Sequence, residues 1–348
     1  MTKIKSALRI ILLIGVACLW AVSIHSSIVK YKQQNSHDKI IINSNSSEIV
    51  CTVDELPESC ENLIIAPFSQ KKYREQILEM EDRTFYCLLS DESCIDGTIE
   101  DIADKDITNL YINNLELHNF EALSHMENLN SLHYSCRNNT LSLNFSGTFP
   151  SLTELDINTI ITDVGNISSI TGLKNLDLSE TDITDISSFS TLTEMEYLNL
   201  SHTGVDDISS LSGMTKMKEL RLDYTNVYDI SAVRDMQNIE LLSSFQNLIH
   251  EKEKLISDVS PLAGKDKLRE LYLYGSDVSD ITPLSNLPNL EKLELSYTPL
   301  ESLAPMYTMP KLKEVAYYHC DSISPDESNA FGEWFRNRDF QVIINGHK

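Results

Sequence analysis

The feature that most constrains the fold is a hydrophobic frame that recurs every 22 residues in two runs. With Leu173 as position 1, the frame has apolar residues at positions 1, 4, 6, 11, 14, 17 and 20. Successive frames begin at Leu173, Met195, Met217 and Ile239, and then at Leu268, Leu290 and Leu312. A repeat of this length marks a stack of supersecondary units, each too small to bury its own apolar face. The chain is therefore predicted to be a solenoid.

Each unit, or coil, is predicted to have one strand and one irregular side. Positions 4 and 6 point to the same side of a short strand, and a spacing of three from position 11 to position 20 favours 3₁₀ turns. The same pattern begins at Ile107, Leu129 and Leu152, so about ten coils should cover residues 106–331. Position 9 carries a small residue that is expected to bond backbone groups freed at the corner of the coil. These residues are Thr181, Thr203, Thr225, Asn247, Ser276, Thr298 and Cys320.

The pattern L-x-x-L-x-L-x-x-[T/N]-x-[I/L]-x-x-[I/L] resembles that of leucine-rich repeats. The segments "ITDISSF", "VDDISSL" and "VSDITPL" resemble the 22-residue coils of bacterial internalin-like proteins. The resemblance implies an α/β solenoid, a leucine-rich repeat horseshoe with a parallel concave sheet and a 3₁₀ or irregular convex side. The chain departs from internalins because position 9 is mostly Thr, no immunoglobulin-like module follows, and "VIINGHK" is no sorting signal. Adhesion to a host receptor is therefore not implied.

The N-terminal residues predict export. The first 30 residues contain Lys3, Lys5, Arg9 and Lys30 and no acid, around an apolar run from Ile10 to Val22. Residues 1–28 are interpreted as a signal sequence or a signal anchor, and both interpretations remain open. Lipidation at Cys18 fits the sequence poorly. Each interpretation places the repeats outside the cytoplasm, after a flexible polar linker over residues 29–50.

Four cysteines precede the repeats, within a predicted N-terminal cap at residues 51–105. Two disulfides among them are expected in an oxidising compartment, with the connectivity open. They are Cys51, Cys60, Cys87 and Cys94. Cys136 and Cys320 lie too many coils apart to bond each other. Cys136 is expected to be the more exposed, and Cys320 a small buried residue.

Both ends of the solenoid are expected to carry helical caps. The spacing of Tyr73, Ile77 and Met80 predicts an amphipathic helix over residues 69–89, with Ser69 as a possible N-cap. At the other end, Phe331, Trp334 and Phe335 share one helical face, and a short strand follows. This segment, residues 332–348, is interpreted as the C-terminal cap rather than as a binding cluster.

The charge of the chain excludes some partners. It has 52 acidic and 28 basic residues, and leaving out the four bases of the first 30 residues gives 52 − 24, a net charge of −28. Nucleic acid is not an expected partner, because phosphate backbones favour basic surfaces. Attraction of the exported part to anionic lipid is excluded for the same reason, so membrane contact is expected only through the N-terminal segment. Such a charge also favours a soluble monomer.

The candidate binding surface is the concave face. Strand positions 3, 5 and 7 point away from the core, and position 8 lies at the rim. Aromatic residues on this face concentrate in the C-terminal half of the repeats, and clustered aromatics ringed by polar groups are typical of interface hot spots. Ordinary cross-strand packing is the alternative. The predicted binding residues are Tyr197, Glu219, Asp223, Tyr224, Phe245, Glu270, Tyr272, Tyr274, Glu294, Tyr297 and Tyr318.

One coil is longer than the others. From Ile239 to Leu268 is 29 residues, an insertion of seven around "LIHEKEK". Insertions in solenoids map to loops on one face and often contact a ligand, so His250, Glu251 and Lys252 are also candidate binding residues. Tolerated sequence drift is the alternative.

The sequence favours a binding protein over an enzyme. It lacks a nucleophile elbow, a phosphate loop, a zinc-protease motif and a dinucleotide turn, so no cofactor or metal is expected. The main hypothesis is an exported recognition module that binds a protein or a cell-surface glycan through its concave face. The alternatives are a self-associating component of the cell envelope, and a regulatory subunit similar to phosphatase-binding repeat proteins.

Overall fold

The computed structural model describes residues 39–43, 49–50, 59–67, 84–89, 106–113, 121–141, 149–161, 164, 166–246, 254–338 and 343–345. The chain divides into two compact units. One contains Met1–Asn139 and Ser146–Leu152, and the other contains Thr140–Phe145 and Thr153–Lys348.

The first unit contains a mixed sheet with the strand order β6-β5-β3-β4-β1-β2. Its elements are β1 (Lys39–Asn43), β2 (Ile49–Val50), β3 (Ser59–Pro67), β4 (Thr84–Leu89), β5 (Asp106–Asn113), the 3₁₀ helix η3 (Glu121–His125) and β6 (Ser131–Leu141). β3, β4, β5 and β6 run parallel, whereas β1 is antiparallel to both of its neighbours.

The helix predicted for residues 69–89 is wrong at its C-terminal end, because strand β4 occupies Thr84–Leu89. This segment reads "TFYCLL", and its aromatic and Thr residues favour a strand. A spacing of three or four between a few apolar residues did not outweigh that preference. Residues 68–83 lie outside the described residues.

The second unit is a stack of coils joined by one parallel sheet, with the order β15-β14-β13-β12-β11-β10-β9-β8-β7. The strands are β7 (Glu154–Ile161), β8 (Asn175–Asp177), β9 (Tyr197–Asn199), β10 (Glu219–Arg221), β11 (Leu241–Ser243), β12 (Glu270–Tyr272), β13 (Lys292–Glu294), β14 (Glu314–Ala316) and β15 (Ile343–Asn345). Neighbouring strands pair at equivalent coil positions, so Leu198 lies beside Leu176 and Leu220.

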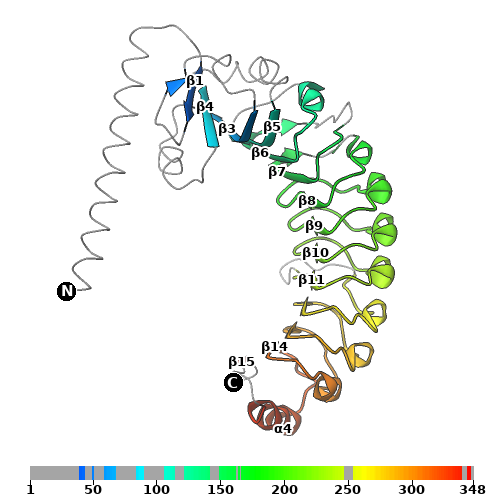
Figure 1. The fold of residues 1–348 in the computed structure, drawn as a ribbon. Helices are drawn as coiled ribbons and strands as arrows, with labels where there is room; N and C mark the ends of the chain where they lie inside the picture. Colours follow the sequence, from blue (N-terminus) through cyan, green and yellow to red (C-terminus); the bar gives the residue numbers. More distant parts are fainter. Residues whose placement is uncertain are drawn as a thin grey trace, which may run out of the picture. The chain divides into compact units, whose positions relative to one another are not determined.

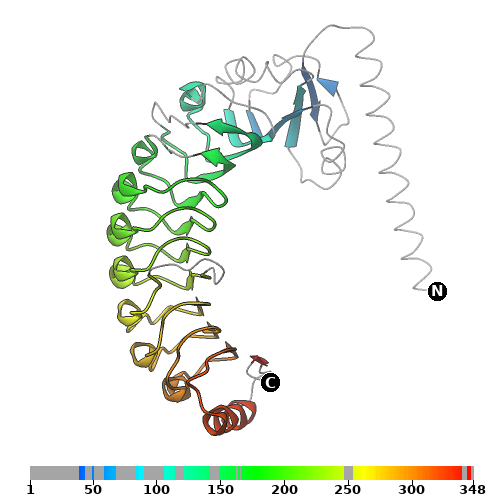
Figure 2. The ribbon, with the colours of Figure 1, turned by 180° about the vertical axis from the view of Figure 1, so that it is seen from behind.

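Each coil from β7 to β13 continues into a 3₁₀ helix on the side opposite the sheet. These helices are η4 (Ile167–Ser169), η5 (Ser187–Thr191), η6 (Ser209–Gly213), η7 (Ser231–Asp235), η8 (Ser260–Leu262), η9 (Thr282–Leu284) and η10 (Ala304–Thr308). Within this unit the strands line the inner side of a curved stack and the 3₁₀ helices line its outer side (Figures 1 and 2). The predicted leucine-rich repeat solenoid is confirmed.

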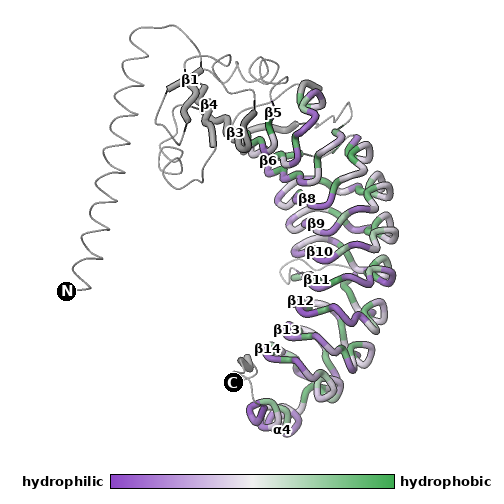
Figure 3. Tube along the Cα trace, viewed as in Figure 1, coloured by the Kyte–Doolittle hydropathy of each residue, from purple (hydrophilic) through white to green (hydrophobic). Residues whose placement is uncertain are grey.

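The hydrophobic frame forms the core between these two layers. Leu173, Leu176 and Leu178 are each 0% exposed, and so are Phe189 and Leu192 of the same coil. Burying a side chain of this size stabilises the fold by about 1.5–3 kcal/mol. Figure 3 shows hydrophilic residues along the strand-bearing side of the stack. The core is therefore continuous from coil to coil, as a repeat protein requires.

The predicted role of position 9 is confirmed in five coils. The hydroxyl of each residue donates a hydrogen bond to the carbonyl oxygen three residues earlier, at 2.6–2.8 Å. The donors are Thr181, Thr203, Thr225, Ser276 and Thr298. Cys320 at the same position is a fully buried free thiol, 3.3 Å from the carbonyl oxygen of Leu295.

The cysteines of the first unit are only partly described. Cys136 is 5% exposed and Cys320 is 0% exposed, so Cys136 is the more exposed of the two as predicted, although strand β6 still carries it into the core. Cys51 and Cys94 lie outside the described residues, so the predicted disulfides stay predictions. Cys87 is paired in register with Ile65, five residues along β3 from Cys60. That offset corresponds to about 16 Å, too far for a bond between Cys60 and Cys87.

The long coil differs from its neighbours inside the core. Ser244 is 0% exposed at position 6, where the other coils carry large apolar residues such as Leu222, Leu273 and Tyr317. Lys265 is 1% exposed where the preceding coil has Met236, and its ammonium group donates to the carbonyl oxygen of Arg234. Burial lowers the pKa of Lys265. The coil that contains the insertion therefore also has the most polar core.

The C-terminal end contains helix α4 (Pro325–Arg336), followed by β15. The hydroxyl of Ser324 accepts a hydrogen bond from the amide of Glu327 at 3.1 Å, which caps the helix. Phe331 and Phe335 are 0% exposed, which confirms the predicted apolar helical face. In the part of the chain that the structure covers, no helix combines the length and apolar character that a membrane span needs. Residues 1–38 lie outside that part.

Candidate recognition surface

Strand positions 3 and 5 form a network of polar side chains that bond one another. Asp177 accepts hydrogen bonds from the amide of Asn199 at 2.9 Å and from the hydroxyl of Tyr197 at 3.3 Å. Burial raises the pKa of Tyr197 to about 12, and the nearby Asp177 adds to this shift. Further along, the pair of Glu219 and Arg221 lies at 3.4 Å. Much of the hydrogen-bonding capacity of these positions is therefore used within the sheet.

The carboxylate of Glu270, like that of Asp177, is bonded to side chains of the sheet. It accepts a hydrogen bond from the hydroxyl of Tyr272 at 2.7 Å and forms an ion pair with Lys292 at 3.0 Å. Burial alone would raise the pKa of Glu270, but these two partners outweigh it and the pKa is lowered. Burial and the bond to Glu270 both raise the pKa of Tyr272.

Positions 7 and 8 form a second surface, at the carboxyl-terminal ends of the strands, and Tyr272 at position 5 joins it to the polar network. Ring centroids of neighbouring residues lie 4.4–5.9 Å apart. His202 packs against Tyr224. In a separate run, Phe245 packs against both Tyr272 and Tyr274. Tyr274 then packs against Tyr297, and Tyr297 packs against His319. We call these seven residues the aromatic ladder. Aromatic pairs of this geometry contribute about 0.5–1.5 kcal/mol each beyond their burial, so ring contacts within the ladder favour this arrangement.

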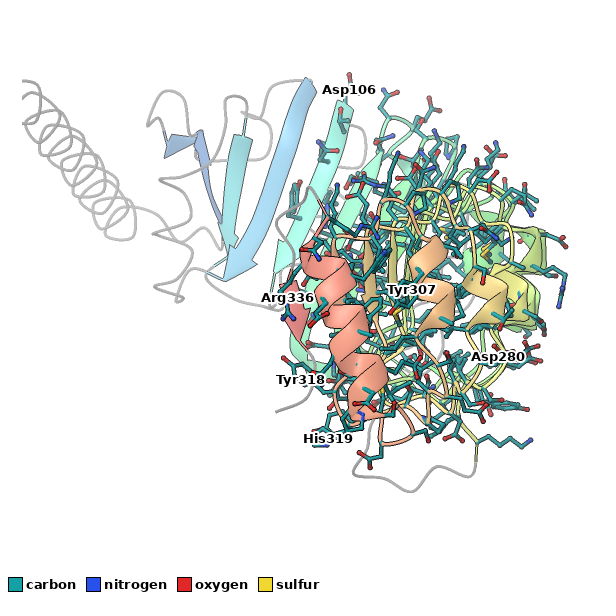
Figure 4. The ribbon with its side chains drawn as sticks, turned by 90° about the horizontal axis from the view of Figure 1, so that it is seen from below. Asp106, Asp280, Tyr307, Tyr318, His319 and Arg336 are labelled. Carbon is teal, nitrogen blue, oxygen red and sulfur yellow. The ribbon has the colours of Figure 1, made fainter. Side chains whose placement is uncertain are left out.

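The ladder is also exposed. Tyr224 is 43% and Tyr297 is 40% exposed, and Tyr318 beside the ladder is 37% exposed. Figure 4 shows Tyr318 and His319 next to each other at one end of the strands. Large exposed aromatics on a preformed surface are typical of interface hot spots.

The backbone at position 8 is in the left-handed region. Its φ is +59° at His202, +58° at Tyr224, +59° at Tyr297 and +55° at His319, and Gly275 occupies the same position in its coil. Non-glycine residues in this conformation are disfavoured by about 1–2 kcal/mol. Glu180 has a φ of +60° at the same position of its coil, so the left-handed conformation belongs to the repeat, which keeps a carboxylate and several rings where glycine would avoid the penalty.

The structure thus separates residues that the sequence grouped on one face. Tyr224, Phe245, Tyr272, Tyr274 and Tyr297 come together in the ladder, with Tyr318 beside it. Tyr197, Glu219 and Glu270 belong to the polar network. Asp223 accepts a hydrogen bond from the hydroxyl of Ser243 at 2.5 Å, and Glu294 accepts one from the amide of Ser296 at 2.7 Å. The insertion residues His250, Glu251 and Lys252 lie outside the described residues.

The predicted binding residues do not include His202 and His319 of the ladder, although both lie at the predicted rim position, and sequence reasoning missed a row of charged residues at position 2. Along successive coils this row reads Lys174, Glu196, Lys218, Glu240, Arg269, Glu291 and Lys313, so its sign alternates throughout. Glu291 pairs with Arg269 at 3.4 Å and with Lys313 at 2.9 Å, and Glu196 pairs with Lys218. The hydrogen bond from Lys218 lowers the pKa of Glu196. Writing position 2 in register would have revealed this charged row.

Among the described residues, no group of three or more His, Cys, Asp or Glu side chains is placed to hold a metal ion. The rings at the carboxyl-terminal ends of the strands are partly exposed, as Tyr224 and Tyr297 show.

Comparisons with known proteins identify the repeats. Residues 171–213 and 266–308 match the family model described as Leucine Rich repeats (2 copies). No curated protein matches the chain. Together with the coil geometry, the matched segments define a leucine-rich repeat solenoid.

Solved structures with a similar fold include two internalins of Listeria monocytogenes. Internalin C2 is 24% identical, over 62% of this chain and 82% of that chain, with a TM-score of 0.48. Internalin F is 17% identical, over 74% and 89%, with a TM-score of 0.47. A chain in an octameric complex of Latrophilin 3, Unc5D and FLRT2 is 15% identical, over 69% and 70%, with a TM-score of 0.45.

Proposed function

We propose that this chain is an exported recognition module that binds a partner protein through its aromatic ladder. The observation that carries the proposal is the run of stacked, partly exposed rings at the carboxyl-terminal ends of the strands. Solenoids of this type present extended surfaces to their ligands, and exposed Tyr residues on such surfaces supply most of the binding energy at interfaces. The basic and apolar N-terminal residues support export, with membrane contact confined to that segment.

The geometry of the ladder favours a protein over a glycan. A sugar ring stacks on an open aromatic face, but here the rings cover one another. Phe245 and Tyr274 lie at 5.5 Å with an interplanar angle of 26°, and Tyr297 and His319 lie at 4.4 Å with an angle of 31°. Ring edges and hydroxyl groups therefore form most of the surface, and these groups suit the side chains and backbone of another protein.

The left-handed backbone at position 8 allows a test that separates binding from stability. Replacing Tyr224→Gly and Tyr297→Gly removes two rings and also relieves two unfavourable backbone conformations, as Gly275 already does in its coil. The lost stacking and the relieved strain are of similar size, about 1 kcal/mol each, so the unfolding midpoint should change little. Affinity for a protein captured by the full-length chain from cell surfaces should fall at least tenfold.

The matched control is Asn286→Gly. Asn286 has a φ of +64° and is exposed, but it lies outside the ladder. Its replacement should leave binding unchanged. Undiminished binding by the double tyrosine variant would place the site elsewhere on the solenoid. Light scattering on the purified chain tests the competing envelope function, which requires self-association rather than the expected monomer of 39.4 kDa.

A further inference from the structure

Coil positions 10, 12 and 13 form a flank between the carboxyl-terminal ends of the strands and the 3₁₀ helices. In the coils from Leu173 to Leu312, outside the insertion, every charged residue at these positions is acidic and exposed. We call this set the acidic flank. It consists of Asp182, Asp185, Asp206, Asp207, Asp229, Asp258, Asp277, Asp280, Glu301 and Asp321. Because positions 7 and 8 immediately precede it, the aromatic ladder borders this flank.

The charged row, which precedes each strand, has a different composition. There the acids alternate with bases and several form ion pairs, such as Glu291 with Lys313 at 2.9 Å. In these coils the flank therefore carries acidic residues without bases, whereas the charged row carries both signs. A charge that served only solubility would not need this arrangement, whereas a one-signed surface attracts a partner of opposite sign.

A second observation on the flank shows a cation already bound there. The ammonium group of Lys254, at the end of the insertion, lies 4.5 Å from the ring centroid of Tyr228. This ring lines a hollow of about 260 Å³ together with Asp206, Asp207 and Asp229. A cation over a Tyr face is stabilised by about 0.5–1 kcal/mol at an exposed site. A lysine head group therefore already lies over an aromatic ring that lines the hollow.

We propose that the aromatic ladder and the acidic flank form one surface for a lysine- and arginine-rich segment of a partner protein. The inference rests on the proposed function and names the chemistry of the partner. Seven coils span roughly 29 Å at the usual strand separation, the length of roughly eight or nine extended residues. Basic side chains of such a segment reach the carboxylates, while its backbone and apolar atoms contact the ring edges of the ladder.

The test uses a fluorescent 12-residue peptide of alternating Arg and Gly, with a Glu and Gly peptide of equal length as the negative control. Binding to the purified full-length chain is measured by fluorescence anisotropy. The flank variant combines Asp206→Asn, Asp277→Asn and Glu301→Gln, whose side chains make no hydrogen bond or ion pair within the described chain. The matched variant combines Asp235→Asn, Asp266→Asn and Glu333→Gln, three exposed acids outside the flank.

The two variants lose the same net charge, so they separate a local surface from general attraction. The flank variant should weaken binding of the Arg and Gly peptide at least fivefold, and the matched variant less than twofold. Equal weakening by both variants, or no binding to the unmodified chain, would overturn the inference.

Lys254 provides an independent measurement. Replacing Lys254→Ala removes a cation that competes for the hollow, and should tighten binding of the Arg and Gly peptide at least threefold. Lys267→Ala removes the same charge at an exposed site outside the flank, where Lys267 bonds Asn238, and should change binding less than 1.5-fold. Equal effects of the two replacements would contradict a cation site at Tyr228.

The outcomes also separate this inference from the proposed function. If the flank variant binds the Arg and Gly peptide as tightly as the unmodified chain does, the inference is wrong. If Tyr224→Gly with Tyr297→Gly still abolishes capture of the partner, the proposed function is nevertheless supported. If the double tyrosine variant captures the partner as well as the unmodified chain does, the proposed function is wrong, whether or not the flank variant weakens peptide binding.

Discussion

The regular coil at residues 217–238 and the long coil that follows it, at residues 239–267, show how much variation one unit of the solenoid tolerates. The regular coil buries Leu222 at position 6 and Met236 near its end, each 0% exposed. The long coil places Ser244 and Lys265 at those positions, and the buried hydroxyl of Ser244 has no hydrogen-bond partner among the described residues.

The long coil nevertheless keeps its place in the sheet. The amide of Ser244 donates to the carbonyl oxygen of Tyr272 at 2.8 Å, and that of Gln246 donates to Tyr274 at 2.9 Å. In a stack where each unit is stabilised mainly by its neighbours, one coil with a poor core can be held by two good ones. An insertion is tolerated best in such a coil, because the backbone pairing, rather than the coil's own core, holds it in register.

The largest effect is expected from making the regular coil resemble the long one. Leu222→Ser removes a fully buried side chain and adds a buried hydroxyl, which should lower the free energy of unfolding by about 3–4 kcal/mol. Urea denaturation followed by circular dichroism measures it. The reciprocal change, Ser244→Leu, should alter stability by less, because its site is already adapted to a small residue. A loss below about 1 kcal/mol for Leu222→Ser would contradict a distinct core in the long coil.

A smaller effect, of opposite sign, is expected from making the long coil resemble the regular one. Lys265→Met replaces a buried ammonium group with the residue type found at Met236, and should raise the free energy of unfolding by about 1–2 kcal/mol. Thermal unfolding near neutral pH measures it. Lys267→Met, at an exposed neighbour, is the control and should have little effect.

The comparison of Lys265→Met with the unmodified chain also predicts a pH dependence. Burial lowers the pKa of Lys265 in the folded chain, so folding disfavours its charged form. The penalty is fully present below the folded pKa and disappears as the pH rises through the unfolded value of about 10.5. The stability difference between Lys265→Met and the unmodified chain should therefore shrink as the pH approaches that value. A constant difference would show that the charge of Lys265 is not the cause.

Hydrogen exchange should show the same contrast without mutation. If the long coil opens more readily by about 1 kcal/mol, its strand amides exchange roughly fivefold faster than those of the regular coil. The amides of Ser244 and Gln246 are compared with those of Leu222 and Tyr224, which occupy the equivalent coil positions and also donate to the next coil. Equal protection would mean that the stack opens as one unit.

The smallest effect concerns the charged row, which crosses both coils. Glu240→Lys places three positive charges in succession with Lys218 and Arg269, and should lower stability by about 0.5–1 kcal/mol. The loss should shrink in 1 M NaCl, because the Debye length falls to about 3 Å. Asp206→Lys, an exposed site outside the row, is the control. A salt-independent loss would point to packing rather than charge.

The fold could be predicted from the sequence because the frame repeats one local rule in many coils. Leu173 and Leu176 are buried for the same reason as their equivalents, and Thr181 bonds the backbone as its position predicts. The helix predicted over residues 69–89 failed where no repeat supported the spacing. Strand β4 shows that local β-preference prevailed there.

The candidate site was predictable only in part. The aromatic residues could be found by aligning the coils, but their division between two surfaces could not. Tyr rarely adopts a positive φ, so nothing in the sequence marked Tyr224 and Tyr297 as left-handed. Their orientation follows from that backbone conformation. It brings the rings of neighbouring coils together at the carboxyl-terminal ends of the strands.

The alternating sign of the charged row also limits how this gene can change length. Deleting one coil would bring two like charges next to each other, whereas deleting two would restore the alternation. Two coils, from Leu173 to Met217, correspond to 217 − 173, or 44 residues. Duplications and losses in such a solenoid should therefore be tolerated best in pairs of coils, and homologues of different length should differ by even numbers of repeats.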